Sequence, residues 1–312
     1  MTARARAAFA VVLAMIAGSA HAQPAPLALL APPPGDDARK AIALGPHGEV
    51  YAPDGSGAWV RTHRFTTVDK LTVVGRAGGV VVAAGDGAVY KLAPNGWSAI
   101  RLHQKDKAIM AGGPRAVAVV KRQLYALDRT KAGEPEKLAL APANVTAIGG
   151  GKSIVIAMAS GLARVERGKV AKIAGAPRQV VRLIDDRWAI VATGAHDLKV
   201  NKTIPWPAGA KVTAIAAGPD GSVIAVAAIA GKLALLTIGS KPGSKLDRQA
   251  IDLTTGAATG TAVGIAIDRA GRAVVALADG RILVRERGAW SETTVKEELP
   301  AARSGPAPAR SP

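Results

Sequence analysis

Apolar residues alternate with polar or small residues in short stretches along most of the chain, and glycine-containing turns separate these stretches. In residues 262–295 four such stretches follow one another, with Gly271, Gly280 and Gly288 in the intervening turns. A period of two places successive side chains on opposite faces of a strand, whereas a helix needs a period of about 3.6. The pattern therefore predicts a four-stranded antiparallel sheet for this segment.

The same four-stretch unit occurs seven times, with a mean period of about 37 residues. Its copies begin near Ala41, Leu71, Ala108, Val145, Val180, Val212 and Val263. A solenoid needs a shorter coil, and a β-sandwich does not repeat a four-stranded unit in this way. Closing the units into a ring leaves only short, protected sheet edges. We therefore expect an all-β chain that folds as a seven-bladed β-propeller of four-stranded antiparallel blades.

Both ends of the chain lack the repeat. Arg4 and Arg6 precede an apolar run, and small residues lead up to Ala22, which is the layout of a secretory signal peptide. The segment before the first repeat is rich in proline and predicts a linker, although residues 27–31 could add a strand that closes the ring. We expect a signal peptide over 1–22, a linker over 23–40, the propeller over 41–299 and a disordered tail over 300–312.

Composition narrows the compartment and the partners. The chain has no cysteine, which excludes disulfides, thiolate metal sites and a lipidated cysteine. Cleavage near Ala22 would leave a periplasmic or secreted protein, and no later apolar run is long enough to span a membrane. The formal net charge is +18 and aromatic residues make up only 3%. We therefore expect a monomer without a cofactor, whose partner is a protein or an anionic envelope or extracellular ligand rather than nucleic acid.

A degenerate motif recurs within the copies. The second copy has Val89 and Tyr90 followed by Gly96 and Trp97. Parts of the same motif are Leu124, Tyr125, Gly288 and Trp290. In this respect the chain resembles seven-bladed propellers of the YVTN, two-component-regulator and BNR-like repeat kinds. The tryptophan is missing from copies three, four and six and no Asp-box is complete, so the resemblance implies a fold and not a chemistry.

Motifs that imitate catalytic or metal sites have simpler structural explanations. Residues 149–153 read GGGKS, but the segment that follows reads as a strand and not as the helix of a phosphate-binding loop, so we expect a hairpin turn. The Asp-Gly pairs lack the further oxygen ligands of a calcium loop and predict turns with positive φ. Histidines of the mature chain never show metal-ligand spacing, and we expect turn or surface positions for them. These histidines are His47, His63, His103 and His196.

Large aromatic side chains are expected to pack between blades rather than to bind a ligand. They are Tyr51, Trp59, Tyr90, Trp97, Tyr125 and Trp290, with Trp206 as a more exposed case. No residue is assigned as catalytic or as a metal ligand.

Basic residues gather in one class of connection. In a propeller, the link from an outer strand to the next inner strand shares a face with the turn between the second and third strands. The basic residues expected on this face are Lys70, Lys105, Lys107, Lys121, Arg122, Arg178 and Lys211. Few acids accompany them, which leads to the hypothesis of an anion-binding mouth over the channel. Ordinary solvation of loops by these side chains is the simpler interpretation, and it is kept beside the hypothesis.

Two functions from different classes remain. The first is an exported, non-catalytic binding or scaffold protein that presents the basic face to a partner. The second is an enzyme that resembles propeller hydrolases or lyases, with a site in the channel. The small apolar inner strands leave Asn144, Asp185 and Asp268 as its channel-side candidates.

Overall fold

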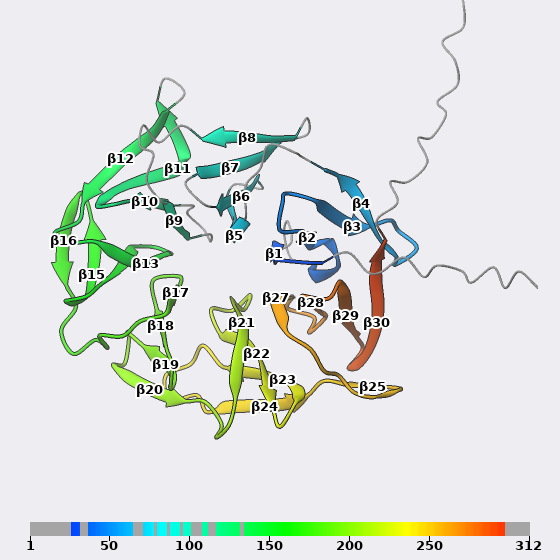
Figure 1. The fold of residues 1–312 in the computed structure, drawn as a ribbon. Coiled ribbons are helices and arrows are strands. Elements are labelled where there is room, and N and C mark those ends of the chain that lie inside the picture. The colour runs from blue at the N-terminus through cyan, green and yellow to red at the C-terminus, as the bar shows by residue number, and fades with distance from the viewer. Residues whose placement is uncertain are drawn as a thin grey trace, which may run out of the picture.

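A computed structural model of the chain shows strands arranged as a ring of small sheets (Figure 1). It describes residues 26–31, 37–64, 71–77, 80–85, 88–93, 96–100, 108–111, 117–131 and 134–296. The expected signal peptide and C-terminal tail lie outside these residues. Within them the helical element is the 3-10 turn η1 (Ala38–Lys40), and no helix is long and apolar enough to cross a membrane.

Five separate four-stranded antiparallel sheets are formed by the described residues. The first contains β5 (Leu71–Ala77), β6 (Val80–Gly85), β7 (Ala88–Ala93) and β8 (Gly96–Ile100). The second contains β9 (Ala108–Ala111), β10 (Val117–Val120), β11 (Gln123–Lys131) and β12 (Glu134–Leu140). The third contains β13 (Val145–Gly150), β14 (Ile154–Met158), β15 (Gly161–Glu166) and β16 (Lys169–Lys172). The fourth contains β17 (Arg182–Ile184), β18 (Trp188–Val191), β19 (Gly194–Asp197) and β20 (Lys202–Pro205). The fifth contains β21 (Lys211–Ala217), β22 (Val223–Ile229), β23 (Lys232–Ile238) and β24 (Leu246–Ala250).

The strands from the two ends of the repeat region form one eight-stranded sheet. One half contains β1 (Leu29–Ala31), β2 (Ile42–Leu44), β3 (Val50–Pro53) and β4 (Trp59–His63). The other half contains β27 (Ala262–Ile267), β28 (Ala273–Leu277), β29 (Arg281–Glu286) and β30 (Ala289–Lys296). A two-stranded ribbon, β25 (Asp252–Leu253) and β26 (Gly256–Ala257), precedes β27.

The prediction of seven separate blades is therefore wrong, because five four-stranded sheets stand alone. Strands β4 and β30 pair in parallel, with Val295 opposite Trp59, and this pairing joins the remaining eight strands. The two end strands of the eight-stranded sheet, β1 and β27, also pack against each other, since Leu30 lies directly over Gly264. The sheet is thus folded back on itself, and its two halves lie next to each other in the ring.

The first strand of the ring comes from the proline-rich segment. The strand considered for residues 27–31 is present as β1, which pairs with β2, and Leu27 N–H donates to the carbonyl oxygen of Ala278. The copy expected to begin near Ala41 therefore has an additional strand before it. The sequence signal was weak because β1 has only three residues, all of them apolar or small, and shows no alternation.

The core lies between neighbouring sheets, as the alternation of apolar residues predicts. Val155 and Leu162 pack against Leu183 of the next sheet, and Val226 packs with Val275 of β28 in the same way. Five of the six aromatic residues assigned to packing, Tyr51, Trp59, Tyr90, Tyr125 and Trp290, are buried as predicted. Trp97 and Trp206 are half-buried; Trp97 donates to the carbonyl oxygen of Gly48, and Trp206 packs on two apolar clusters.

Glycine-containing hairpin turns connect the strands. Arg167 and Gly168 have φ of 48° and 79°, and Arg287 and Gly288 have φ of 51° and 86°. Positive φ at both central residues is typical of the type I′ hairpin turn, whose twist matches that of the flanking strands. The described glycines of the Asp-Gly pairs also have positive φ, which confirms that these pairs form turns.

Candidate functional site

Four of the seven basic residues expected on the ligand-binding face are described. Lys121 and Arg122 form the turn between β10 and β11, Arg178 lies in the link between β16 and β17, and Lys211 is the first residue of β21. All four are exposed. Lys70, Lys105 and Lys107 lie outside the described residues.

The four described residues differ in the contacts that their side chains make with the rest of the protein. Nε of Arg122 donates to the carbonyl oxygen of Ala141 at 2.6 Å, which ties its turn to the link that follows β12. Lys121 has φ of 55° and also interacts with its surroundings. No ion pair or side-chain hydrogen bond of Arg178 or Lys211 is found within the described part of the chain. Arg178 and Lys211 therefore have the freest cationic groups of the four.

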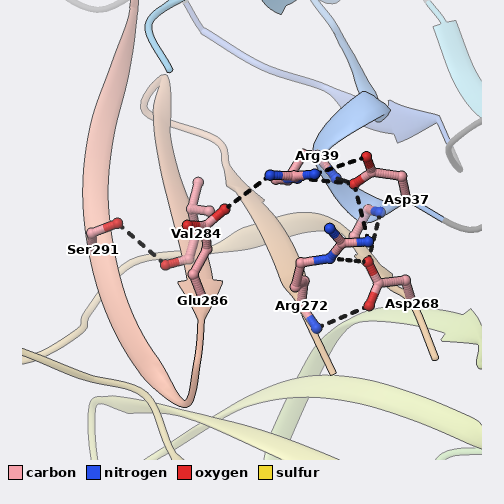
Figure 2. A network of polar contacts seen from close by, with 8 residues as sticks. Asp37, Arg39, Asp268, Arg272, Val284, Glu286 and Ser291 are labelled. Atoms are coloured by element: carbon pink, nitrogen blue, oxygen red, sulfur yellow. Dashed lines mark hydrogen bonds and ion pairs between the residues drawn. The ribbon is translucent and has the colours of Figure 1, made fainter. Parts of the chain in front are cut away.

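Asp268, one of the three channel-side candidates, has a structural role. Its carboxylate lies 2.6 Å from Nε of Arg272 and accepts a hydrogen bond from the backbone N–H of Ala38 at 3.2 Å (Figure 2). Arg272 also reaches Asp37, whose other neighbour is Arg39. Burial alone would raise the pKa of Asp268, but these hydrogen bonds and the Arg272 charge outweigh it and hold the pKa below its ordinary value. The carboxylate is committed to joining η1 to the turn between β27 and β28.

The other two candidates are not brought together with Asp268. Asn144 precedes the inner strand β13, whereas Asp185 and Asp268 follow the inner strands β17 and β27. Because inner strands run the same way around a propeller, Asn144 lies at the opposite end from the two aspartates. The three residues therefore do not form one channel site.

The GGGKS segment and the two neighbouring aspartates form one contact between adjacent sheets. A Cβ at Gly149 would lie 2.0 Å from the carbonyl oxygen of Asp185, so only glycine allows this approach. The carboxylate of Asp186 accepts hydrogen bonds from the backbone N–H and the hydroxyl of Ser153 at 2.8 and 3.0 Å. The predicted hairpin turn between β13 and β14 is confirmed, and its glycines serve packing rather than phosphate binding.

Burial disfavours the charged form of Asp185 at this contact. Desolvation and the adjacent charge of Asp186 raise its pKa from 3.8 to about 6. The folded state therefore binds a proton more tightly than the unfolded state, and ionised Asp185 costs stability above pH 6.

We expect Asp185→Asn to stabilise the protein at pH 7.5 by about 1–2 kcal/mol, less than the full pKa shift implies because Asp185 is only half-buried. Asparagine also tolerates the φ of 51° at this position. Denaturant unfolding should show the gain at pH 7.5 and its loss near pH 4, where wild-type Asp185 is protonated in the fold. An equal gain at both pH values would show that charge is not its cause.

His196 departs from the expectation of a turn or surface position. It lies in β19, is 6% exposed, and hydrogen-bonds through Nδ1 to Thr203 and through Nε2 to Asn201. His47 and His63 are exposed as predicted, and His103 lies outside the described residues. Within the described ranges no group of three His, Asp or Glu side chains is placed to hold a metal ion.

A cavity of about 350 Å³ lies between the β17–β20 sheet and the β21–β24 sheet. Trp188, Val200, Ile204 and Leu246 give it apolar walls, and its cationic lining residues are Lys202, Lys241 and Lys245. None of these was selected from the sequence. The available signal was the long hairpin between β23 and β24, which inserts two lysines into the sixth copy.

Comparison with known proteins addresses the fold. No protein-family model and no curated protein matches the chain. The WD40 propeller domain of Doa1 has a TM-score of 0.57 at 16% identity and covers 85% of this chain and 99% of its own. The WD40 domain of Neurospora crassa Pan2 has a TM-score of 0.54 at 12% identity, covering 74% of this chain and 80% of its own.

A bacterial structure is similar to the same degree. The extracellular domain of the two-component system BT4673 from B. thetaiotaomicron has a TM-score of 0.55 at 12% identity, over 88% of this chain and 38% of its own. Identities this low carry no chemistry. The expected YVTN, two-component-regulator or BNR-like repeat family stays a prediction, and the comparisons show that this chain is a β-propeller.

Proposed function

We propose that the protein is an exported, non-catalytic binding module that engages a polyanionic ligand through the basic face of its propeller. The observation that carries the proposal is the pair of exposed cations Arg178 and Lys211, which have no ion-pair partner within the described residues. Arg178 lies in a link from an outer strand to the next inner strand, and Lys211 follows such a link directly as the first residue of the inner strand β21. Unpaired cations at one end of successive sheets attract an extended anion more strongly than cations that are already neutralised by ion pairs.

Charge and compartment support the same proposal. A formal net charge of +18 produces a positive potential at long range, which speeds the capture of acidic partners. Export rests on the N-terminal sequence pattern, and one propeller of similar fold is described as an extracellular domain. An anionic envelope or extracellular glycan, or an acidic protein surface, is the partner class that fits both properties.

Charge reversal tests the proposed face. We expect Arg178→Glu with Lys211→Glu to weaken binding to a sulfated glycan about tenfold or more, because both cations would become repulsive. The matched control is Lys169→Glu with Lys172→Glu, which makes the same change in net charge on the exposed outer strand β16. Affinity is measured by titration calorimetry at low salt. Equal weakening by both pairs would mean that net charge alone attracts the glycan and would sink the proposed face.

A further inference from the structure

In the cavity between the β17–β20 and β21–β24 sheets, apolar surface and unpaired positive charge lie side by side. The cavity lies at the turn between β19 and β20 and the hairpin between β23 and β24. In antiparallel four-stranded sheets these turns are at the opposite end from the start of the first strand, where Lys211 lies. The cavity is therefore separate from the basic face.

The floor of the cavity is fixed by contacts from four turns. Trp188 is 2% exposed and its Nε1–H donates to the carbonyl oxygen of Gly221 at 3.0 Å. Arg187 stacks on the Trp188 ring at 4.6 Å and donates to both carboxylate oxygens of Asp197, at 3.1 and 2.6 Å. The same guanidinium donates to the carbonyl oxygen of Ser240. A floor held in this way needs no rearrangement to receive a ligand, which lowers the cost of binding.

The charge left over in the cavity is positive. Asp197 is the acidic residue of its lining, and Arg187 neutralises it. Burial would raise the pKa of Asp197, but the Arg187 hydrogen bonds outweigh it and keep the pKa low, so the pair stays ionised. Lys202, Lys241 and Lys245 are exposed and form no ion pair with the described residues. Asp247 follows the lining residue Leu246 in a strand, so its side chain points to the other face.

Apolar surface completes the site. Val200 is a large apolar side chain that is 40% exposed at the wall of the cavity, next to Ile204 and Pro205. The volume of about 350 Å³ is at the lower end of the range for small-molecule pockets. An occupant of this size could cover Val200 and the partly buried Ile204 and Leu246 while it presents an acidic group to the lysines.

We propose that this cavity binds a small organic anion with a flat or branched apolar body, of the aromatic or branched aliphatic carboxylate class. The body lies against Val200, Ile204 and Leu246 above the buried Trp188, and the carboxylate is held by Lys241 and Lys245 of the β23–β24 hairpin. Burial of the body provides the affinity and the lysines select for the anion. The site is independent of the polyanion-binding face, so either can fail alone.

The test uses 2-naphthoate as the probe, titrated into the purified protein and followed by tryptophan fluorescence and calorimetry. Acetate supplies the charge without the body, and the methyl ester of 2-naphthoate supplies the body without the charge. We expect 2-naphthoate to bind at least about tenfold more tightly than either, since each lacks one of the two interactions.

Two variants locate the probe. Lys241→Glu with Lys245→Glu, and separately Val200→Asp, should each weaken 2-naphthoate binding about tenfold, because each places a negative charge at the cavity. All three residues are exposed, so we expect the fold to survive, and an unchanged thermal midpoint checks this. Lys169→Glu with Lys172→Glu is the control and should bind like the wild type. No binding at millimolar 2-naphthoate, equal binding of the ester, or unchanged affinity in both cavity variants would overturn the proposal.

Discussion

Asp268→Asn is expected to lower the free energy of unfolding by about 2–4 kcal/mol, because it leaves Arg272 without its buried counter-ion. The side chain of Asp268 is fully buried and that of Arg272 is 28% exposed, so water replaces the lost partner only in part. The substitution also weakens the acceptor for the N–H of Ala38, which holds the N-terminal segment on the turn after β27. Urea unfolding monitored by circular dichroism measures the loss.

A second ion pair on the same half of the eight-stranded sheet gives the control. Asp279 and Arg281 are 2.8 Å apart, but the Asp279 side chain is 51% exposed. We expect Asp279→Asn to lower the free energy of unfolding by less than about 1 kcal/mol, because an exposed ion pair contributes little to stability. The pKa of Asp268 is lowered in the fold, so its contribution is present above the unfolded value of 3.8 and is lost as the pH falls below it. Equal costs for the two substitutions at pH 7, or a cost for Asp268→Asn that does not shrink as the pH falls below 3.8, would contradict the assigned role.

Gly264→Ala should separate β1 from β27 and cost about 2–3 kcal/mol, since overpacking in a tight contact is destabilising. The added Cβ would lie 2.4 Å from Cβ of Leu30 and 2.7 Å from its backbone nitrogen. A flexible side chain could move aside, but the backbone of β1 cannot without giving up its pairing with β2. Limited proteolysis should therefore show faster cleavage near β1 in addition to the lower stability.

Val263→Ala is the control in the same strand. Val263 is partly buried beside Gly264, and its truncation removes contacts without adding a collision. We expect a loss of about 1 kcal/mol and no new cleavage near β1. If Gly264→Ala leaves the protease pattern unchanged, β1 is not held where the structure places it.

The repeating hairpins could be predicted from the sequence because their determinants are local. Alternation and positive-φ glycines specify strands and turns, and these are found at Gly221, Gly280 and Gly288. A ring-closing strand over residues 27–31 could be considered from the sequence, but the contacts that hold β1 could not be predicted. Its sheet partner β2 follows closely in the chain, but Gly264, against which Leu30 packs, and Ala278, which accepts from the N–H of the preceding Leu27, are more than 200 residues away. Nothing in the three residues of β1 indicates these contacts.

A candidate site could be predicted from the sequence only where its residues lie in one segment of the chain. Single lysines and arginines in the links and in the turn between the second and third strands led to the hypothesis of a basic face, but Nε of Arg122 donates to the carbonyl oxygen of Ala141. The role of Asp268 depends on the N–H of Ala38, and the cavity needs side chains from two neighbouring repeats. Such groupings arise from tertiary packing, which a pattern along the chain does not encode.

Thermal unfolding of the chain from residue 23 onward, with and without a sulfated glycan, tests the proposed function most directly. A ligand that binds only the native state at a hundredfold excess over its Kd adds about 2.7 kcal/mol of stability. We expect a higher midpoint at low salt, a smaller increase near physiological salt, where charges are screened over about 8 Å, and no increase with a neutral glycan. An unchanged midpoint at low salt, or the same increase with the neutral glycan, would contradict the proposed function.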